Sequence, residues 1–194
     1  MLKKFNIHDH FVISYIGTLG VANGLGYFIE CARASQKAAL RIMFIVCGEG
    51  AMLSNLKNAA VRLSLQNIQF VPFQNRDGVR DIMNVSDAVF VSYKNVQVLE
   101  TGSPNKYFDG LAAAKLIIAN FGGWLKNEIE MERCGISLDP HHPTEIVTKI
   151  RPFLDDPVLL REFQQRARVL AEHKYSRKIL GNYFFDVVKE ATTH

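Results

Sequence analysis

The sequence contains few cysteines, and they are arranged neither as a metal site nor as a redox pair. Its 194 residues include only three cysteines, which lie in apolar stretches without any Cys-x-x-Cys spacing. This pattern is typical of reduced core thiols in a cytoplasmic protein. The histidines lack metal-ligand spacing on any single element, so we expect no metal site. The residues concerned are Cys31, Cys47 and Cys134, and His8, His10, His141, His142, His173 and His194.

Long hydrophobic runs are absent as well. No apolar stretch approaches the roughly 18 residues of a membrane-spanning helix, and no signal peptide is recognisable. Hydrophobic residues make up 48% of the chain and charged residues 22%, which argues against a disordered or fibrous protein. We therefore expect a cytoplasmic globular protein, with the inner face of the membrane as the alternative location.

Neither sign of charge dominates. Lys and Arg number 23 against 19 Asp and Glu, which gives a net charge of +4 and a pI near 9.0. Such a balance suits phosphate ligands or an anionic membrane surface and requires neither, so peripheral membrane association stays open. The basic residues late in the chain have spacings that fit solvated helix faces, and we expect no nucleic-acid partner.

Two common nucleotide-binding fingerprints are missing too. Counted from Gly24, the third glycine of Gly-x-Gly-x-x-Gly would fall at Ile29, and counted from Gly48 it would fall at Leu53. No Walker A sequence occurs either, so neither an NAD site nor a P-loop is predicted. The glycine-rich loop that begins at Gly17 nevertheless follows an apolar run and opens a helical one, where glycines let a backbone approach a phosphate closely. A generic tight turn is the alternative.

Apolar strand-like runs alternate with helical periodicity over most of the chain. This alternation predicts an α/β fold with a doubly wound, mostly parallel, six-stranded Rossmann-like sheet that is covered on both faces. The expected strands are Phe11–Ile16, Arg41–Cys47, Asn67–Val71, Ala88–Ser92, Leu116–Asn120 and Gly135–Leu138. The expected helices lie near Gly24–Ser35, Ala51–Leu65, Gly78–Val85, Asn105–Ala114, Trp124–Arg133 and Thr144–Leu154.

Two more helices are expected at the C-terminal end. Asp156-Pro157 starts one that runs to about His173, and Ser176 caps another that reaches Lys189. No linker, low-complexity tract or internal repeat divides the chain. We therefore predict a single domain over residues 1–194 with a helical extension from about residue 156.

The segment that begins at Thr101 carries the most chemical information. Ser103 is a good N-cap and Pro104 suits the first helical position, so the free amides of the first turn form an anion site. Lys106 adds a positive charge, and Asp109 can accept two hydrogen bonds from a vicinal diol such as a ribose. The alternative is a capped amphipathic helix with a solvated lysine and aspartate.

Glycines follow two other expected strands, as Gly48-Glu-Gly50 and as Gly122-Gly123. Ligands of a doubly wound fold bind at the carboxyl ends of its strands, and glycine-bearing loops at one edge favour an extended anionic ligand. No histidine falls in these loops, so no nucleophilic triad is expected and the catalytic residues stay unassigned. For Trp124 we favour core packing over a position facing the cleft.

The order of these motifs resembles the C-terminal, donor-binding half of GT-B glycosyltransferases, in the large retaining group of glycosyl transferases group 1. The resemblance covers residues 11–189, nearly the whole chain, and the Ser-Pro-Asn-Lys-x-Phe-Asp form is similar to transferases of bacterial surface-polysaccharide assembly. The motifs are Tyr15-Ile-Gly17-Thr-Leu-Gly20, Asn23-Gly24-Leu25, Val46-Cys-Gly48-Glu-Gly50, Asn67-Ile-Gln-Phe70, Ser86-Asp87-Ala88, Ser103-Pro-Asn-Lys106, Phe108-Asp109, Ala112-Ala-Ala-Lys115 and Asp155-Asp156-Pro157.

This resemblance implies a transferase of hexosyl or N-acetylhexosaminyl type that takes a nucleotide-diphosphate sugar. It would transfer the sugar, with retention and without a cofactor or metal, to a polysaccharide or lipid-linked acceptor. The diphosphate is expected at the first loop and the Ser103 loop, the ribose at Asp109, and the base near Val71–Phe73. The donor-binding residues so implied are Gly17, Thr18, Gly20, Phe73, Ser103, Asn105, Lys106 and Asp109.

The sequence also departs from the family pattern. Thr101 stands where the first acid of the Glu-x7-Glu pair is expected, and Glu100 is one position out of register. Thr18 and Asn23 replace the usual diphosphate-binding Arg and Lys of the first loop. In addition, Leu116 replaces a common proline, which affects packing more than chemistry.

The resemblance further implies a second, acceptor-binding domain, supplied in cis or in trans. Without it we expect the isolated chain to be inactive, and the last helix, with Tyr183, Phe184 and Val188, to have a partly bare apolar face or to be covered by a second copy. A non-catalytic nucleotide-sugar-binding subunit or pseudoenzyme is the alternative function. A sugar-nucleotide epimerase is disfavoured, since no paired acid and base are found.

Overall fold

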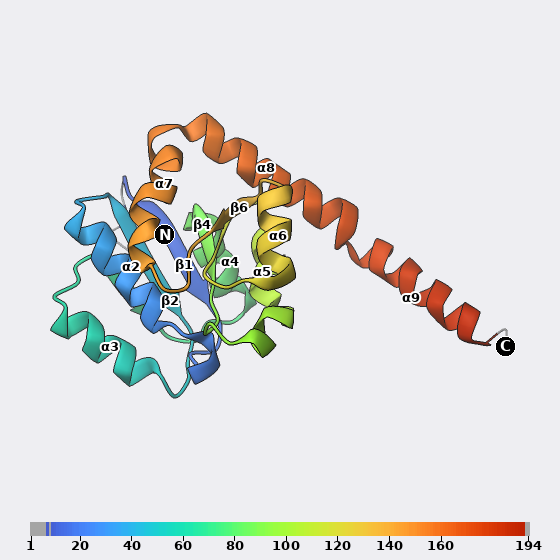
Figure 1. Cartoon of the computed structure of the whole chain (residues 1–194), viewed down its shortest axis with the longest axis horizontal. Coiled ribbons are helices and arrows are strands. Elements are labelled where there is room, and N and C mark those ends of the chain that lie inside the picture. Colours follow the sequence, from blue (N-terminus) through green and yellow to red (C-terminus); the bar gives the residue numbers. More distant parts are fainter. Residues whose placement is uncertain (1–6, 8, 193–194) are drawn as a thin grey trace.

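In a computed structural model, which describes residue 7 and residues 9–192, the chain forms a six-stranded sheet flanked by helices (Figure 1). All its strand pairs are parallel, and the strand order is β3-β2-β1-β4-β5-β6. The strands are β1 (Phe11–Ile16), β2 (Ile42–Cys47), β3 (Ile68–Val71), β4 (Ala88–Val91), β5 (Leu116–Ala119) and β6 (Gly135–Ser137). The predicted doubly wound fold is confirmed, and each strand lies within a residue of its expected bounds.

The helices connect these strands and continue beyond them. The α-helices are α2 (Gly26–Lys37), α3 (Leu53–Arg62), α4 (Arg76–Val85), α5 (Asn105–Ala112), α6 (Gly123–Met131), α7 (Ile146–Asp155), α8 (Pro157–Lys174) and α9 (Arg177–Thr192). Short 3-10 turns occur at η1 (Val21–Asn23), η2 (Gln97–Thr101) and η3 (Pro143–Glu145). None of the helices in the described part of the chain is long and apolar enough to cross a membrane.

Alternate residues of the strands feed cores on the two faces of the sheet. On one face, Ile13 and Tyr15 pack with α2 and α7 around the fully buried Phe28. On the other face, Val12 packs with α4, while Ile117 packs with α5, α6 and α8. The central strands are buried on both sides, which explains why they read as continuous apolar runs.

The three cysteines are free thiols in these cores, as their apolar surroundings predict. Burial raises the pKa of Cys31 and raises that of Cys134 to about 12, so these thiols stay protonated near neutral pH. Trp124 is partly buried against the core that contains Tyr107 and Leu125, and the preference for core packing is confirmed.

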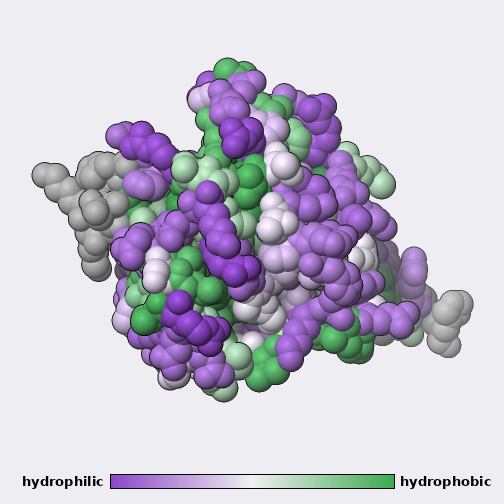
Figure 2. Space-filling model, turned by 60° about the vertical axis from the view of Figure 1, so that its left-hand side comes forward, coloured by the Kyte–Doolittle hydropathy of each residue, from purple (hydrophilic) through white to green (hydrophobic). Residues whose placement is uncertain are grey.

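The two C-terminal helices differ in their relation to this body. Asp156 caps α8, and its carboxylate accepts hydrogen bonds from the amides of Val158 (2.8 Å) and Leu159 (3.1 Å). Helix α8 packs along α5, whereas α9 extends away from the body (Figure 1) and contains no buried residue. The face of the molecule shown in Figure 2 is mainly polar, with smaller hydrophobic areas between.

Candidate functional site

The largest cavity near the predicted motifs lies at the carboxyl edge of the sheet. Its volume is about 630 Å³. It is bounded by the loops after β1, β2, β3 and β4 and by the first turn and a half of α5. The lining residues are Ile16, Gly17, Thr18, Cys47, Gly48, Glu49, Phe73, Gln74, Val79, Tyr93, Ser103, Pro104, Asn105, Lys106 and Asp109. We call this cavity the edge pocket.

The edge pocket brings together all but one of the eight residues that the sequence suggested. Gly20 is the exception, because it does not line the pocket. Its amide donates to the side chain of Asn23 (3.1 Å), and it caps the short turn η1. Gly20 therefore stabilises the conformation of the first loop without lining the pocket.

Backbone hydrogen bonds join the first glycine loop, which begins at Gly17, to the second, which begins at Gly48. The amide of Gly17 donates to the carbonyl of Cys47 (2.9 Å), and the amide of Leu19 donates to the carbonyl of Glu49 (2.7 Å). A Cβ added at Gly48 would lie 1.9 Å from the carbonyl oxygen of Gly17, and Gly48 has a φ of +144°. Only glycine fits there, so the second loop holds the first in place.

The N-cap of α5 lies one residue later than predicted. Pro104 is the N-cap, in an extended conformation, and Asn105 is the first helical residue. No side chain caps this end, so the assignment of Ser103 as the N-cap is wrong. Because Pro104 is extended, Ser103 lies too far back for its hydroxyl to cap the first turn, and it lines the edge pocket instead. The positive end of the α5 dipole is thus left for a ligand.

Lys106 projects from α5 toward the first loop. A Cβ added at Gly17 would lie 3.5 Å from Cε of Lys106, and the ammonium lies 5.0 Å and 5.8 Å from the ring centroids of Tyr15 and Tyr93. Burial lowers the pKa of Lys106, and the nearby Asp109 carboxylate opposes this shift. A partly desolvated cation between aromatic rings interacts more strongly with an incoming anion than a solvated one does.

Asp109 stands one turn after Asn105 at the rim of the edge pocket and is exposed. Although the residue as a whole is exposed, neighbouring protein atoms partly desolvate its carboxyl group and raise its pKa, and Lys106 acts in the opposite direction. An ionised carboxylate at this position can accept hydrogen bonds from a diol while Lys106 faces an anion.

Several lining residues were not selected from the sequence. Tyr93 follows β4, and its ring packs edge-on against Phe121 with the centroids 5.1 Å apart. Glu49 and Gln74 contribute polar groups from the second and third loops. The strand ends were predicted correctly, so an aromatic or polar residue directly after each strand was the available signal.

The Gly122-Gly123 loop, which was grouped with the other glycine loops, does not reach the edge pocket. Glu100 of η2 fills this space, because a Cβ added at Gly122 would lie 3.0 Å from its Oε1 atom. Both residues line a separate cavity of about 270 Å³. Thr101 donates its hydroxyl to the carbonyl of Val98 (2.9 Å) within the same turn. The loop therefore lies outside the edge pocket, and one extended ligand shared with the other glycine loops stays a prediction.

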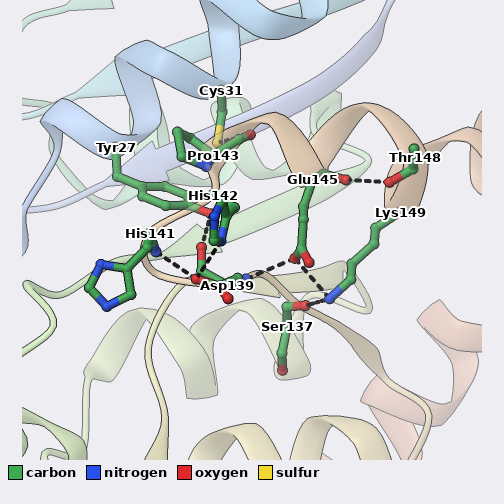
Figure 3. Close-up of polar contacts among 10 residues, drawn as sticks. All are labelled: Tyr27, Cys31, Ser137, Asp139, His141, His142, Pro143, Glu145, Thr148 and Lys149. Atoms are coloured by element: carbon green, nitrogen blue, oxygen red, sulfur yellow. Dashed lines mark hydrogen bonds and ion pairs between the residues drawn. The ribbon is translucent and has the colours of Figure 1, made fainter.

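A polar cluster follows β6 beside that second cavity (Figure 3). Asp139 accepts from the amide of His141 (2.7 Å) and pairs with Nδ1 of His142 (3.2 Å), and both contacts lower the pKa of Asp139. Its amide donates to Glu145 (2.8 Å), and its carbonyl accepts from the hydroxyl of Tyr27 (2.6 Å). These contacts tie the loop to α2 and η3 and so stabilise the fold at this end of the sheet.

Comparisons with known proteins agree with this architecture. The family model "Glycosyl transferases group 1" matches residues 2–170. The chain belongs to this family of glycosyltransferases. A curated relative, the alpha-D-kanosaminyltransferase of Streptomyces kanamyceticus, is 18% identical over 191 residues, which cover 97% of this chain and 48% of the relative. The chain thus spans about half the length of that glycosyltransferase.

Solved glycosyltransferase structures share the fold. Anabaena HepE in complex with UDP and glucose superposes with a TM-score of 0.81 at 14% identity, over 97% of this chain and 51% of HepE. TarM of S. aureus gives a TM-score of 0.76 at 16% identity, over 91% and 35% of the two chains. The C-terminal domain of LpcC from Francisella tularensis gives 0.73 at 19% identity, over 90% and 92%. The chain therefore has the fold of a GT-B half-domain.

Proposed function

We propose that this chain is the donor-binding half of a retaining glycosyltransferase that uses a nucleotide-diphosphate sugar. The observation that carries this proposal is the meeting of Lys106, the α5 N-terminus and the Gly17 loop around one pocket, with Asp109 at its rim. Membership of the glycosyl transferases group 1 family supports it, as does the fold shared with HepE, which was solved with UDP-glucose.

Each part of the donor has a candidate partner in the edge pocket. The diphosphate would lie between the Gly17-Thr18 backbone and the side chains of Ser103, Asn105 and Lys106. Asp109 would hold the ribose hydroxyls, and the exposed ring of Phe73 would contact the base. In the reaction, the bond between the anomeric carbon and the diphosphate oxygen breaks and its electron pair stays on the diphosphate. The acceptor hydroxyl oxygen bonds to the same face of the sugar and gives its proton to the leaving diphosphate. The α5 amides and Lys106, in place of a bound cation or cofactor, would stabilise the leaving charge.

The acceptor is proposed to be a polysaccharide or a lipid-linked acceptor, and the protein is proposed to act in the cytoplasm, with the inner face of the membrane as the alternative location. A second domain, in cis or in trans, would bind this acceptor and close the cleft. The uncovered apolar face of α9 supports such a partner, because exposed aromatic side chains of this kind usually mark a contact surface.

A non-catalytic nucleotide-sugar-binding subunit is the second candidate. Asn23 occupies the position of a diphosphate-binding cation in the family, and its side chain accepts from the Gly20 amide. Thr18 and Thr101 likewise replace charged residues of that pattern. Transfer activity in the presence of the partner domain separates the two candidates.

The test of the proposed site compares two ligands. Asp109→Ala should weaken the binding of a nucleoside diphosphate by roughly 1.5–3 kcal/mol, the range for hydrogen bonds to a charged group. It should weaken the binding of inorganic pyrophosphate much less. Lys106→Ala should weaken both. Isothermal titration calorimetry measures the four affinities, and Asp186→Ala on α9 is the control that should change none. If Asp109→Ala loses the same affinity for both ligands, Asp109 does not bind the ribose.

The isolated chain should not transfer sugar, even with its correct donor. Holding both reactants together contributes about 7–11 kcal/mol to such a reaction, and half of a cleft holds only one of them. A radiolabelled-donor assay checks this expectation. Transfer to an acceptor without any partner protein would show that the catalytic unit is complete in this chain.

A further inference from the structure

One buried carboxylate outside the edge pocket connects α5, α6 and the C-terminal end of α8. Glu128 of α6 is only 8% exposed. Its Oε2 accepts from the phenols of Tyr107 (2.6 Å) and Tyr175 (2.6 Å), and its Oε1 pairs with the ammonium of Lys174. Burial alone would raise the pKa of Glu128, but the bonds from Lys174 and the two tyrosines hold it below its usual value. The group is therefore a buried anion with hydrogen-bonding partners on both of its oxygens.

Tyr107 is the partner that leads toward the edge pocket. It directly follows Lys106 in the first turn of α5 and is completely buried. Its ring packs edge-on against Trp124, with the centroids 5.8 Å apart, and Trp124 donates its indole N–H to the carbonyl of Gly102 (3.0 Å). Helix α6 thus holds both the loop before α5 and the first turn of α5, through side chains one turn apart.

The placement of this turn decides whether the edge pocket can form. Asn105, Lys106 and Asp109 all depend on it, while the Gly17 loop is fixed independently by its bonds to the second loop. A shift of α5 by a fraction of an ångström would move Lys106 relative to a loop that does not follow. No side chain caps the N-terminus of α5, so the local sequence supplies little else to fix its start.

We propose that Glu128 is a positioning residue for the edge pocket: through the phenol of Tyr107 it sets where the first turn of α5 presents Asn105, Lys106 and Asp109. This inference rests on the proposed function, since it concerns the same anion site. Glu128 itself does not line the pocket, so its effect on a ligand must pass through α5.

The two tyrosines provide a matched pair of variants. Tyr107→Phe and Tyr175→Phe each delete one phenol that donates to the same carboxylate oxygen at the same distance. Tyr107→Phe should lower the affinity for inorganic pyrophosphate about threefold to tenfold, a range typical of coupling within one hydrogen-bond network. Tyr175→Phe should lower stability yet leave the affinity unchanged. Equal losses in the two variants, or no loss in Tyr107→Phe, would overturn the proposal.

A variant of the carboxylate tests the route of the effect. Glu128→Gln should lower the affinity for pyrophosphate as much as Tyr107→Phe does. The double variant should lose no more affinity than either single variant. Additive losses in the double variant would show that Glu128 acts on the ligand by a route other than Tyr107, which contradicts the proposal.

A measurement without ligand separates this inference from the proposed function. Trp124 is the single tryptophan of the chain and contacts both Tyr107 and the loop before α5. Tyr107→Phe should therefore raise the iodide quenching of its fluorescence, whereas Tyr175→Phe should not. Absence of pyrophosphate binding by the wild-type chain would defeat the proposed function, while unchanged quenching in Tyr107→Phe would defeat the positioning role by itself.

Discussion

Helices α2 and α9 both have an apolar stripe, but that of α2 is buried and that of α9 is exposed. Helix α2 buries Phe28, Ile29 and Ala32 against the sheet. Helix α9 carries apolar residues at i, i+3, i+4, i+7 and i+8, and all of them are exposed, up to 72% for Phe184. These residues are Leu180, Tyr183, Phe184, Val187 and Val188. Amphipathic spacing therefore predicts that a helix has a face to bury and leaves open what will cover it.

The energetic contrast between these helices should be large. Phe28 is completely buried and packs edge-on against Phe44 and Phe90, with centroids 5.1 Å and 5.0 Å away. Phe28→Ala should lower the free energy of unfolding by about 3–5 kcal/mol, as in other large-to-small core changes. Phe184→Ala should change it by less than about 0.5 kcal/mol. Urea unfolding followed by Trp124 fluorescence measures both.

The stability of Phe184→Ala also tests whether α9 is uncovered in solution. If Phe184→Ala also costs more than about 1 kcal/mol in the purified chain, α9 packs against something in solution. Repeating the measurement at several protein concentrations then identifies a second copy as the cover, because only self-association makes that cost depend on concentration.

Glu128, beside the junction of the body and α9, should give a smaller and pH-dependent effect. Its folded-state pKa is depressed, so its stabilising contribution is present above the unfolded pKa and is lost as the pH falls through the folded value. Near pH 7, Glu128→Gln should cost about 1.5–3 kcal/mol, the range for hydrogen bonds to a charged group. The difference from the wild type should shrink as the pH falls below the usual glutamate range.

Chemical unfolding at a series of pH values checks this expectation, with Glu130→Gln as the control on the exposed side of α6. A cost of Glu128→Gln that stays constant down to the lowest pH at which the protein folds would mean that the buried charge contributes nothing beyond shape.

The sequence predicted the sheet better than it predicted the site. Strand positions follow from apolar runs that are buried on both faces, and they were correct to within a residue. The expected helix start at Asn105 was correct, but its N-cap was assigned to Ser103 because serine is a good N-cap locally, whereas the extended Pro104 is the N-cap. The sequence did not show that the Gly122 loop lies outside the edge pocket, because this depends on Glu100, whose approach is set by tertiary packing. Tyr93 was missed although its place directly after the expected strand Ala88–Ser92 was an available signal.

The smallest predicted effects concern two backbone positions, one in the body and one in α9. Ala114 follows α5 with a φ of +52°, a left-handed conformation that costs a non-glycine residue roughly 1–2 kcal/mol. Part of this is offset by the extra chain entropy that glycine loses, about 0.5–1 kcal/mol, so Ala114→Gly should stabilise the body by roughly 0.5–1 kcal/mol. In a protein of this size that corresponds to an increase in Tm of about 1–4 °C.

Gly181 in α9 is the opposite case, since a Cβ added there meets no atom within 4 Å. Gly181→Ala should strengthen α9 by about 0.8–1 kcal/mol of helix propensity. Because α9 buries no residue against the body, this gain should appear as added helical signal in circular dichroism and leave the body's Tm, followed by Trp124 fluorescence, unchanged. A Tm increase in Gly181→Ala equal to that in Ala114→Gly would instead show that α9 unfolds together with the sheet, and the contrast between the two regions would then be one of exposure alone.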